Sequence, residues 1–133
     1  SGCANSCAHH HWADIGLFGL VRRVGDQPAP HYALVLGGGT DATPLGTRIA
    51  EIPARRVGIA VRRVLSSYLA ERSESESFSQ FVGRQAPGQW ATRLADLSAG
   101  YAGNQDVFRD AGSDEVFAVK TGGPAPGTPK GDC

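Results

Sequence analysis

Residues 13–36 read ADIGLFGLVRRVGDQPAPHYALVL, and this stretch decides the fold. Its two ends are rich in Val, Ile, Leu, Phe and Tyr, which are enriched in strands. Its middle, GDQPAP, is polar and rich in proline, which is typical of a connection. The pattern predicts a hairpin of two antiparallel strands, Ala13 to Val24 and Tyr32 to Leu36, joined by a loop of about six residues.

Glycines interrupt and end this hairpin. Gly16 and Gly19 lie inside the first strand, where glycine often marks a bulge or the close approach of something bulky. Residues 37–39 are three consecutive glycines. They lack the Lys-Ser/Thr pair of a P-loop and the spacing of a dinucleotide-binding fingerprint, so they predict a turn after the second strand.

Downstream of the hairpin the pattern becomes helical. A further extended segment is expected over Leu45 to Ile52, and a helix over Pro53 to Arg72, because proline is tolerated at a first helical position. The apolar stripe of this helix consists of Val57, Val61, Val64, Leu65, Tyr68 and Leu69. Four arginines (Arg55, Arg56, Arg62 and Arg63) lie mainly off the stripe and predict a solvated face.

Two shorter helices and an edge strand complete the expected fold. Ser77 with Gln80 forms a capping-box pattern, and a third helix is expected from Pro87 to Gly100. Val116 to Val119 predicts a last edge strand. The class is therefore α+β, with a small mixed, mainly antiparallel sheet packed by two or three helices. One domain is expected over residues 1–121, followed by a Gly/Pro-rich tail over 122–133.

Composition restricts the function. The 133 residues fit one domain, and 13 basic side chains balance 13 acidic ones, which argues against nucleic acid or an anionic membrane as a partner. The longest apolar run is too short for a membrane span. Three cysteines, an odd number, favour a reduced cytoplasmic setting. Because the chain begins with Ser1 and has no Met, we expect it to be part of a larger protein with a segment upstream.

The chemistry is concentrated in residues 1–19, SGCANSCAHHHWADIGLFG. Cys3 and Cys7 are soft sulfur ligands in a Cys-x3-Cys pair, followed by three histidines. With one or two of these histidines the pair suits a small structural zinc module, which stays open as an alternative. An iron–sulfur cluster usually takes four thiolates, so this chain alone cannot complete one.

This stretch resembles the second half of the siroheme and [4Fe–4S] signature of the assimilatory nitrite and sulfite reductase family. YALVLGGG, LGTRIAEIPARRV, ERSESESFSQFV and GSDEVFAVKTGG with a late KGDC are similar to the C-terminal region of that family. The resemblance implies that Cys3 and Cys7 ligate the cluster, and that the Cys7 thiolate also serves as the axial ligand of the siroheme iron. Asn5 matches the polar position beside the cluster. Ala4 departs from the family, which often has proline there.

The histidines are candidates for binding the siroheme carboxylates, with His9 and His10 ahead of His11. The family implies six-electron reduction of sulfite to sulfide or of nitrite to ammonia, with ferredoxin or a similar electron donor. The fragment alone is expected to be inactive, because the other cysteine pair and the residues that bind the anionic substrate lie upstream. A relative of precorrin-3B synthase, which shares the cluster scaffold, is a further alternative. Asp14 is expected to make loop hydrogen bonds, and Cys133 is expected not to be a ligand.

Overall fold

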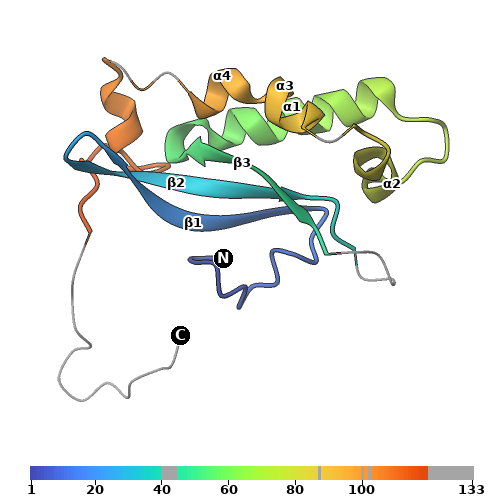
Figure 1. Cartoon of the computed structure of the whole chain (residues 1–133), viewed down its shortest axis with the longest axis horizontal. Helices are drawn as coiled ribbons and strands as arrows, with labels where there is room; N and C mark the ends of the chain where they lie inside the picture. Colours follow the sequence, from blue (N-terminus) through green and yellow to red (C-terminus); the bar gives the residue numbers. More distant parts are fainter. Residues whose placement is uncertain (40–44, 87, 100, 102, 120–133) are drawn as a thin grey trace.

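The chain forms a three-stranded antiparallel sheet with helices on one face. A computed structural model describes residues 1–39, 45–86, 88–99, 101 and 103–119. The strands β1 (Ile15–Val24), β2 (Gln27–Leu36) and β3 (Thr47–Pro53) lie in the order β1-β2-β3 (Figure 1). The predicted hairpin, the third extended segment and the α+β class are confirmed.

The connection of the hairpin is shorter than predicted. Val24 pairs with Gln27, so the loop contains only Gly25 and Asp26, and the prediction of about six residues was wrong. The prolines of GDQPAP belong to β2, where β3 does not reach, because the β2–β3 pairing begins at His31. Proline lacks a ladder donor and is tolerated where a strand has a free edge.

The helices form a layer on one face of the sheet, and the chain's first residues lie on the opposite face. The layer contains two short 3-10 helices, η1 (Ala54–Arg56) and η2 (Gln105–Phe108). The α-helices are α1 (Val57–Glu71), α2 (Phe78–Gly83), α3 (Gln89–Arg93) and α4 (Ala95–Ser98), drawn above the sheet in Figure 1. The helix expected over 53–72 is therefore present, preceded by a 3-10 turn, whereas the third helix divides at Leu94.

The capping box at the start of α2 is confirmed. The backbone N–H of Gln80 donates to the Ser77 hydroxyl (3.3 Å), and that of Ser77 donates to the Gln80 side chain (2.9 Å). The predicted stripe of α1 was partly wrong, because Leu65 and Leu69 are exposed while Val64 is buried. Fewer of the apolar residues of α1 therefore pack against the sheet than the stripe predicts.

The arginines near α1 fix neighbouring elements and do not form a plain solvated face. Arg56 donates to the carbonyl of Ala99 at 2.6 Å, beyond the C-terminal end of α4. Arg63 binds the carboxylate of Asp96, and Arg55 binds that of Asp114. The guanidinium groups thus donate hydrogen bonds to a backbone carbonyl and to carboxylates of the C-terminal part of the chain.

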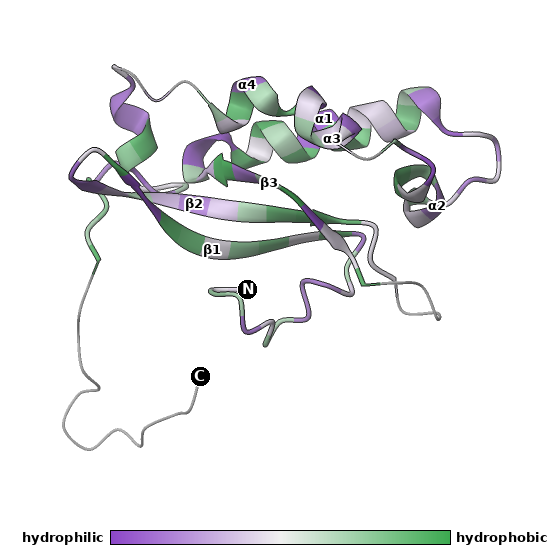
Figure 2. Cartoon of the chain, in the orientation of Figure 1, coloured by the Kyte–Doolittle hydropathy of each residue, from purple (hydrophilic) through white to green (hydrophobic). Residues whose placement is uncertain are grey.

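The main core lies between the sheet and the helices, and Figure 2 shows apolar residues (green) in the strands and in parts of the helices. Phe81 is fully buried in it and packs edge-to-face against Tyr68 and Trp90, with ring centroids 5.4 and 5.9 Å away. The buried residues of this cluster are Leu34, Leu36, Ile52, Ala60, Val64, Phe81, Trp90, Leu94 and Leu97.

The C-terminal part differs from expectation. Val116 makes one isolated bridge with Arg109 and does not join the sheet, so the predicted edge strand over 116–119 was wrong. The tail predicted over 122–133, with Cys133, lies outside the described residues. Within the described part of the chain, no helix is long and apolar enough to cross a membrane.

Candidate functional site

The segment that carries both candidate cysteine ligands, residues 1–14, lies along the face of the sheet that the helices leave open (Figure 1). Its beginning is fixed to the outer edge of β1. The N-terminal ammonium of Ser1 donates to the carbonyl of Leu17 at 2.8 Å, and the N–H of Gly19 donates to the carbonyl of Ser1 at 3.0 Å. These two bonds attach the chain start to the free edge of β1.

The end of the segment is fixed to the glycine turns beside β2 and β3. The N–H of Gly37 donates to the carbonyl of Asp14 at 3.0 Å, and the N–H of Gly46 donates to the carbonyl of His11 at 2.7 Å. Asp14 accepts this bond through its backbone carbonyl, so the hydrogen bonding expected of its side chain stays a prediction. Both ends of the cysteine segment are attached to the sheet by backbone groups.

Between these attachments the chain makes two tight turns. The N–H of His9 donates to the carbonyl of Ser6 (2.7 Å), and the N–H of Trp12 donates to the carbonyl of His9 (2.9 Å). Ser6 and His9 have φ values of 60° and 52°, in the left-handed region that costs a residue with a Cβ about 1–2 kcal/mol. Non-glycine residues in this conformation are frequent at functional sites.

Cys3, Asn5 and Cys7 are all exposed on this segment, and both cysteines are free thiols. A thiolate must be accessible to bind a metal, so both side chains meet the first requirement of a ligand. Among the described residues, however, no group of three or more His, Cys, Asp or Glu side chains lies close enough to hold a metal ion. The histidines therefore do not complete a zinc site around the two cysteines.

The three histidines point into different environments. His10 is only 3% exposed and packs on Phe18, with ring centroids 4.6 Å apart, and on His11, at 4.3 Å. Neither ring nitrogen of His10 has a hydrogen-bond partner. Burial, and then the neighbouring His11, lower the pKa of His10, so its ring is held neutral. An unpartnered buried imidazole is costly and accepts a polar partner readily.

His9 and His11 are less enclosed. The exposed ring of His9 stacks on that of Trp12, with centroids 5.4 Å apart and an angle of 22° between the planes. His11 is half-buried beside His10. The rings of His10 and His11 thus lie together near Phe18, whereas the His9 ring is exposed beside Trp12.

A second small cluster lies on the same open face of the sheet. Phe18, Ala33 and Val35 are buried there, and the guanidinium of Arg48 lies 5.7 Å from the centre of the Phe18 ring. Glu51 on β3 forms ion pairs with both Arg22 and Arg48. Sequence reasoning missed this group; only strand alternation, which puts residues 18, 20 and 22 on one face, pointed to it.

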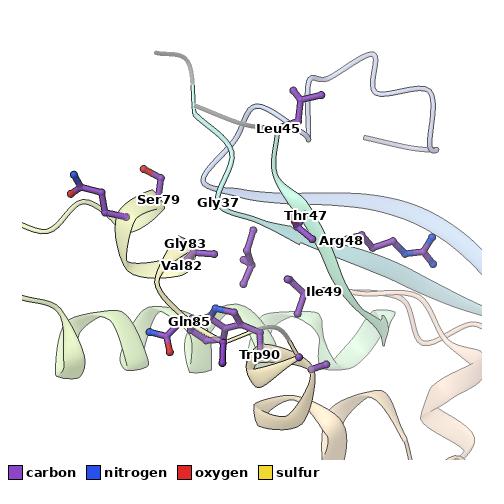
Figure 3. A pocket seen from close by; sticks show the side chains of 15 residues that line it. Gly37, Leu45, Thr47, Arg48, Ile49, Ser79, Val82, Gly83, Gln85 and Trp90 are labelled. Carbon is purple, nitrogen blue, oxygen red and sulfur yellow. The ribbon is translucent and has the colours of Figure 1, made fainter. Parts of the chain in front are cut away.

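The largest cavity described lies elsewhere, on the helical side of the sheet. It has a volume of about 630 Å³ between the start of β3 and the helices α2 and α3 (Figure 3). Leu36, Ile49, Val82 and Trp90 are among its lining residues, and no cysteine or histidine is. The candidate ligands are therefore separated from this cavity by the sheet.

Comparisons with known proteins agree with one another. No protein-family model matches the sequence. The chain is 28% identical over 89 residues to an assimilatory ferredoxin-dependent nitrite reductase of Haloferax mediterranei, matching 65% of the chain and 15% of that protein. It is 34% identical over 89 residues to the sulfite reductase [NADPH] hemoprotein beta-component of Bacillus subtilis, matching 63% of the chain and 14% of that protein.

The fold supports the same relationship. The structure of the Mycobacterium tuberculosis NirA protein matches 63% of the chain and 16% of its own, with a TM-score of 0.56 and 32% sequence identity. The chain thus spans about one seventh of the length of these relatives. By sequence and by fold, the chain is thus similar to a part of nitrite and sulfite reductases.

Proposed function

We propose that this chain supplies one half of the ligand set of a siroheme- and [4Fe–4S]-dependent reductase. In this proposal Cys3 and Cys7 are two of the four cluster ligands, and Cys7 is also the ligand shared with the siroheme iron. When bound, the coupled siroheme and cluster supply the electrons that reduce sulfite to sulfide or nitrite to ammonia. The observation that carries the proposal is the exposed Cys3–Cys7 turn, fixed to the sheet at both ends.

The residues present fit half of such a site. Two accessible thiols four positions apart are suitable cluster ligands, and the described residues add no further side chain to them. In this proposal the remaining ligands come from another part of a larger protein. This also supports the expectation that the chain by itself does not carry out the reduction.

Asn5, His9 and His10 are proposed to contact the cofactors. Asn5 is exposed between the two cysteines and offers both a donor and an acceptor. His9 is exposed two positions after Cys7. The two unpartnered ring nitrogens of His10 are the strongest support, because a polar group arriving at this segment relieves their unsatisfied burial.

The substrate and the electron donor are proposed at the level of class. The substrate is a small oxyanion, sulfite or nitrite, and one relative of each kind matches the chain. One relative is named as ferredoxin-dependent and another as an NADPH enzyme component, so the donor is a ferredoxin or a similar carrier. The residues that bind the substrate are expected in the part of the protein that lies upstream.

The test is Cys7→Ser in the protein made from the complete reading frame that encodes this chain. The variant is expected to lose the visible haem bands and the reductase activity. The matched control is Cys133→Ser, which is expected to keep both. Because Cys7 is exposed, the far-ultraviolet circular dichroism is expected to stay unchanged. A Cys7→Ser protein that keeps its haem spectrum contradicts the assignment.

A further inference from the structure

Two glycines of β1 and one glycine just after β2 leave no room for a side chain. A Cβ on Gly19 would lie 2.7 Å from the carbonyl oxygen of Gly2, and one on Gly38 would lie 2.6 Å from that of Ala13. A Cβ on Gly16 would overlap the carbonyl of His10. All three obstacles are backbone atoms of the segment that carries Cys3 and Cys7. We call Gly16, Gly19 and Gly38 the glycine seat.

The strands themselves do not require these glycines. Gly16 pairs with Val35 and Gly19 with Tyr32 in a continuous register, and the only irregularity of the sheet is between Leu34 and Val35 on the β3 side. Glycine weakens a regular strand, so its presence at two β1 positions needs another cause. The close approach of residues 1–14 is that cause.

The glycine seat also sets the distance between the backbone of residues 1–14 and the sheet. Its contacts are from backbone to backbone, so no change of rotamer can relieve a clash there. The hydrogen bonds from Gly19, Gly37 and Gly46 require the same close approach. Together they over-determine the backbone on both sides of Cys7, which allows Ser6 and His9 to keep their left-handed conformations.

We propose that Gly16, Gly19 and Gly38 are positioning residues for the two cysteines. By admitting the backbone of residues 1–14 against the sheet, they set the turn from which Cys3 and Cys7 project before any cofactor arrives. Site geometry held in advance by rigid elements spares the cost of ordering it during binding. The effect on cofactor loading rests on the function proposed above, whereas the effect on the segment does not.

The first experiment uses amide hydrogen exchange, followed by NMR, on the 133-residue chain. Gly16→Ala and Gly38→Ala are compared with Gly58→Ala, a helical position where a Cβ meets nothing within 4 Å. The amides of Gly37 and Gly46, which donate to the segment, are expected to lose at least tenfold protection in both seat variants. The β1–β2 ladder amides of His31 and Ala33 are expected to stay protected.

Two outcomes overturn the proposal. Unchanged protection of Gly37 and Gly46 shows that the segment does not depend on the seat. Uniform loss of protection through the sheet shows that the glycines serve the strands alone. Gly38 lies outside the strands, so its variant keeps the test valid if Gly16→Ala does not fold.

The second experiment measures the haem and iron content of the complete protein with the same variants. Both seat variants are expected to lose at least half of the bound cofactor, with all cysteines intact, while Gly58→Ala keeps it. If a seat variant loses protection at Gly37 and Gly46 but retains its cofactor, the glycine seat affects only the backbone of residues 1–14. That result overturns the proposal that the seat positions the cysteines for the cofactor. Absence of cofactor in the unsubstituted protein instead refutes the proposed function and leaves the exchange result standing.

Discussion

Replacing His10 by leucine is expected to stabilise the chain. The ring is buried and both nitrogens lack partners, and one unsatisfied buried polar group costs about 1–3 kcal/mol. Leucine removes that cost but loses the ring contacts with Phe18 and His11, which contribute about 0.5–1.5 kcal/mol each. Two unpartnered nitrogens together cost about 2–6 kcal/mol and the two lost contacts about 1–3 kcal/mol, so the expected net gain is about 1–3 kcal/mol, which raises Tm by several degrees.

The assay is urea unfolding at pH 7.5 and pH 5.5. Since burial lowers the pKa of His10 below its ordinary value of 6.5, the unfolded chain binds a proton that the folded chain does not. This contribution to stability is complete above pH 6.5 and is lost as the pH falls toward the lowered pKa of the folded state. The original chain should therefore lose more stability at pH 5.5 than His10→Leu does.

Two comparisons decide the outcome. His31, whose pKa burial also lowers, gives the same sign of pH dependence in both proteins and cancels in the difference. The matched control is His11→Leu, which loses the contact with His10 but relieves no unpartnered buried nitrogen, and it is expected to lower stability by about 0.5–1.5 kcal/mol. A His10→Leu chain that is less stable than the original refutes the reasoning, because the nitrogens must then have partners in solution.

Three further outcomes are expected. Phe81→Ala, at the centre of the aromatic cluster, should lower the free energy of unfolding by about 3–5 kcal/mol in urea titrations, and a loss below about 1 kcal/mol argues against the packed core. Ser77→Ala removes the helix cap and should cost about 1 kcal/mol by thermal unfolding, more than the neighbouring Ser79→Ala. Anaerobic reconstitution of the 133-residue chain with iron and sulfide should leave less than one cluster per chain, and stoichiometric iron and sulfide would show that Cys3 and Cys7 need no outside ligands.

Local signals predicted much of the fold. The hairpin, the helix after Pro53 and the cap at Ser77 follow from strand propensity, helical periodicity and capping chemistry, which act over a few residues. The tight turn at Gly25 was missed because Pro28 and Pro30 indicate a loop locally. These prolines are tolerated within β2 because β3 pairs with β2 only from His31 onward, and the sequence around them does not show this long-range feature.

The candidate site was predictable only in part. Cys3, Asn5 and Cys7 stand together in the sequence, and their exposure agrees with a role as ligands, which remains a prediction. The burial of His10 could not be predicted from the sequence, because it depends on Phe18 and on the path of residues 1–14 across the sheet. Gly16 did suggest a close approach, which is confirmed, but the sequence did not identify what approaches.

The central strand β2 divides the molecule into two chemically separate compartments. Leu34 and Leu36 face the helical core, while Ala33 and Val35 face the cysteine segment, and all four are buried. The single layer of strands thus separates the aromatic cluster on one face from the segment with the two thiols on the other. Substitutions on opposite faces of the sheet share no partners, so their effects on stability should add. Changes on the helical side can therefore adjust stability without disturbing the face that carries the cysteine segment.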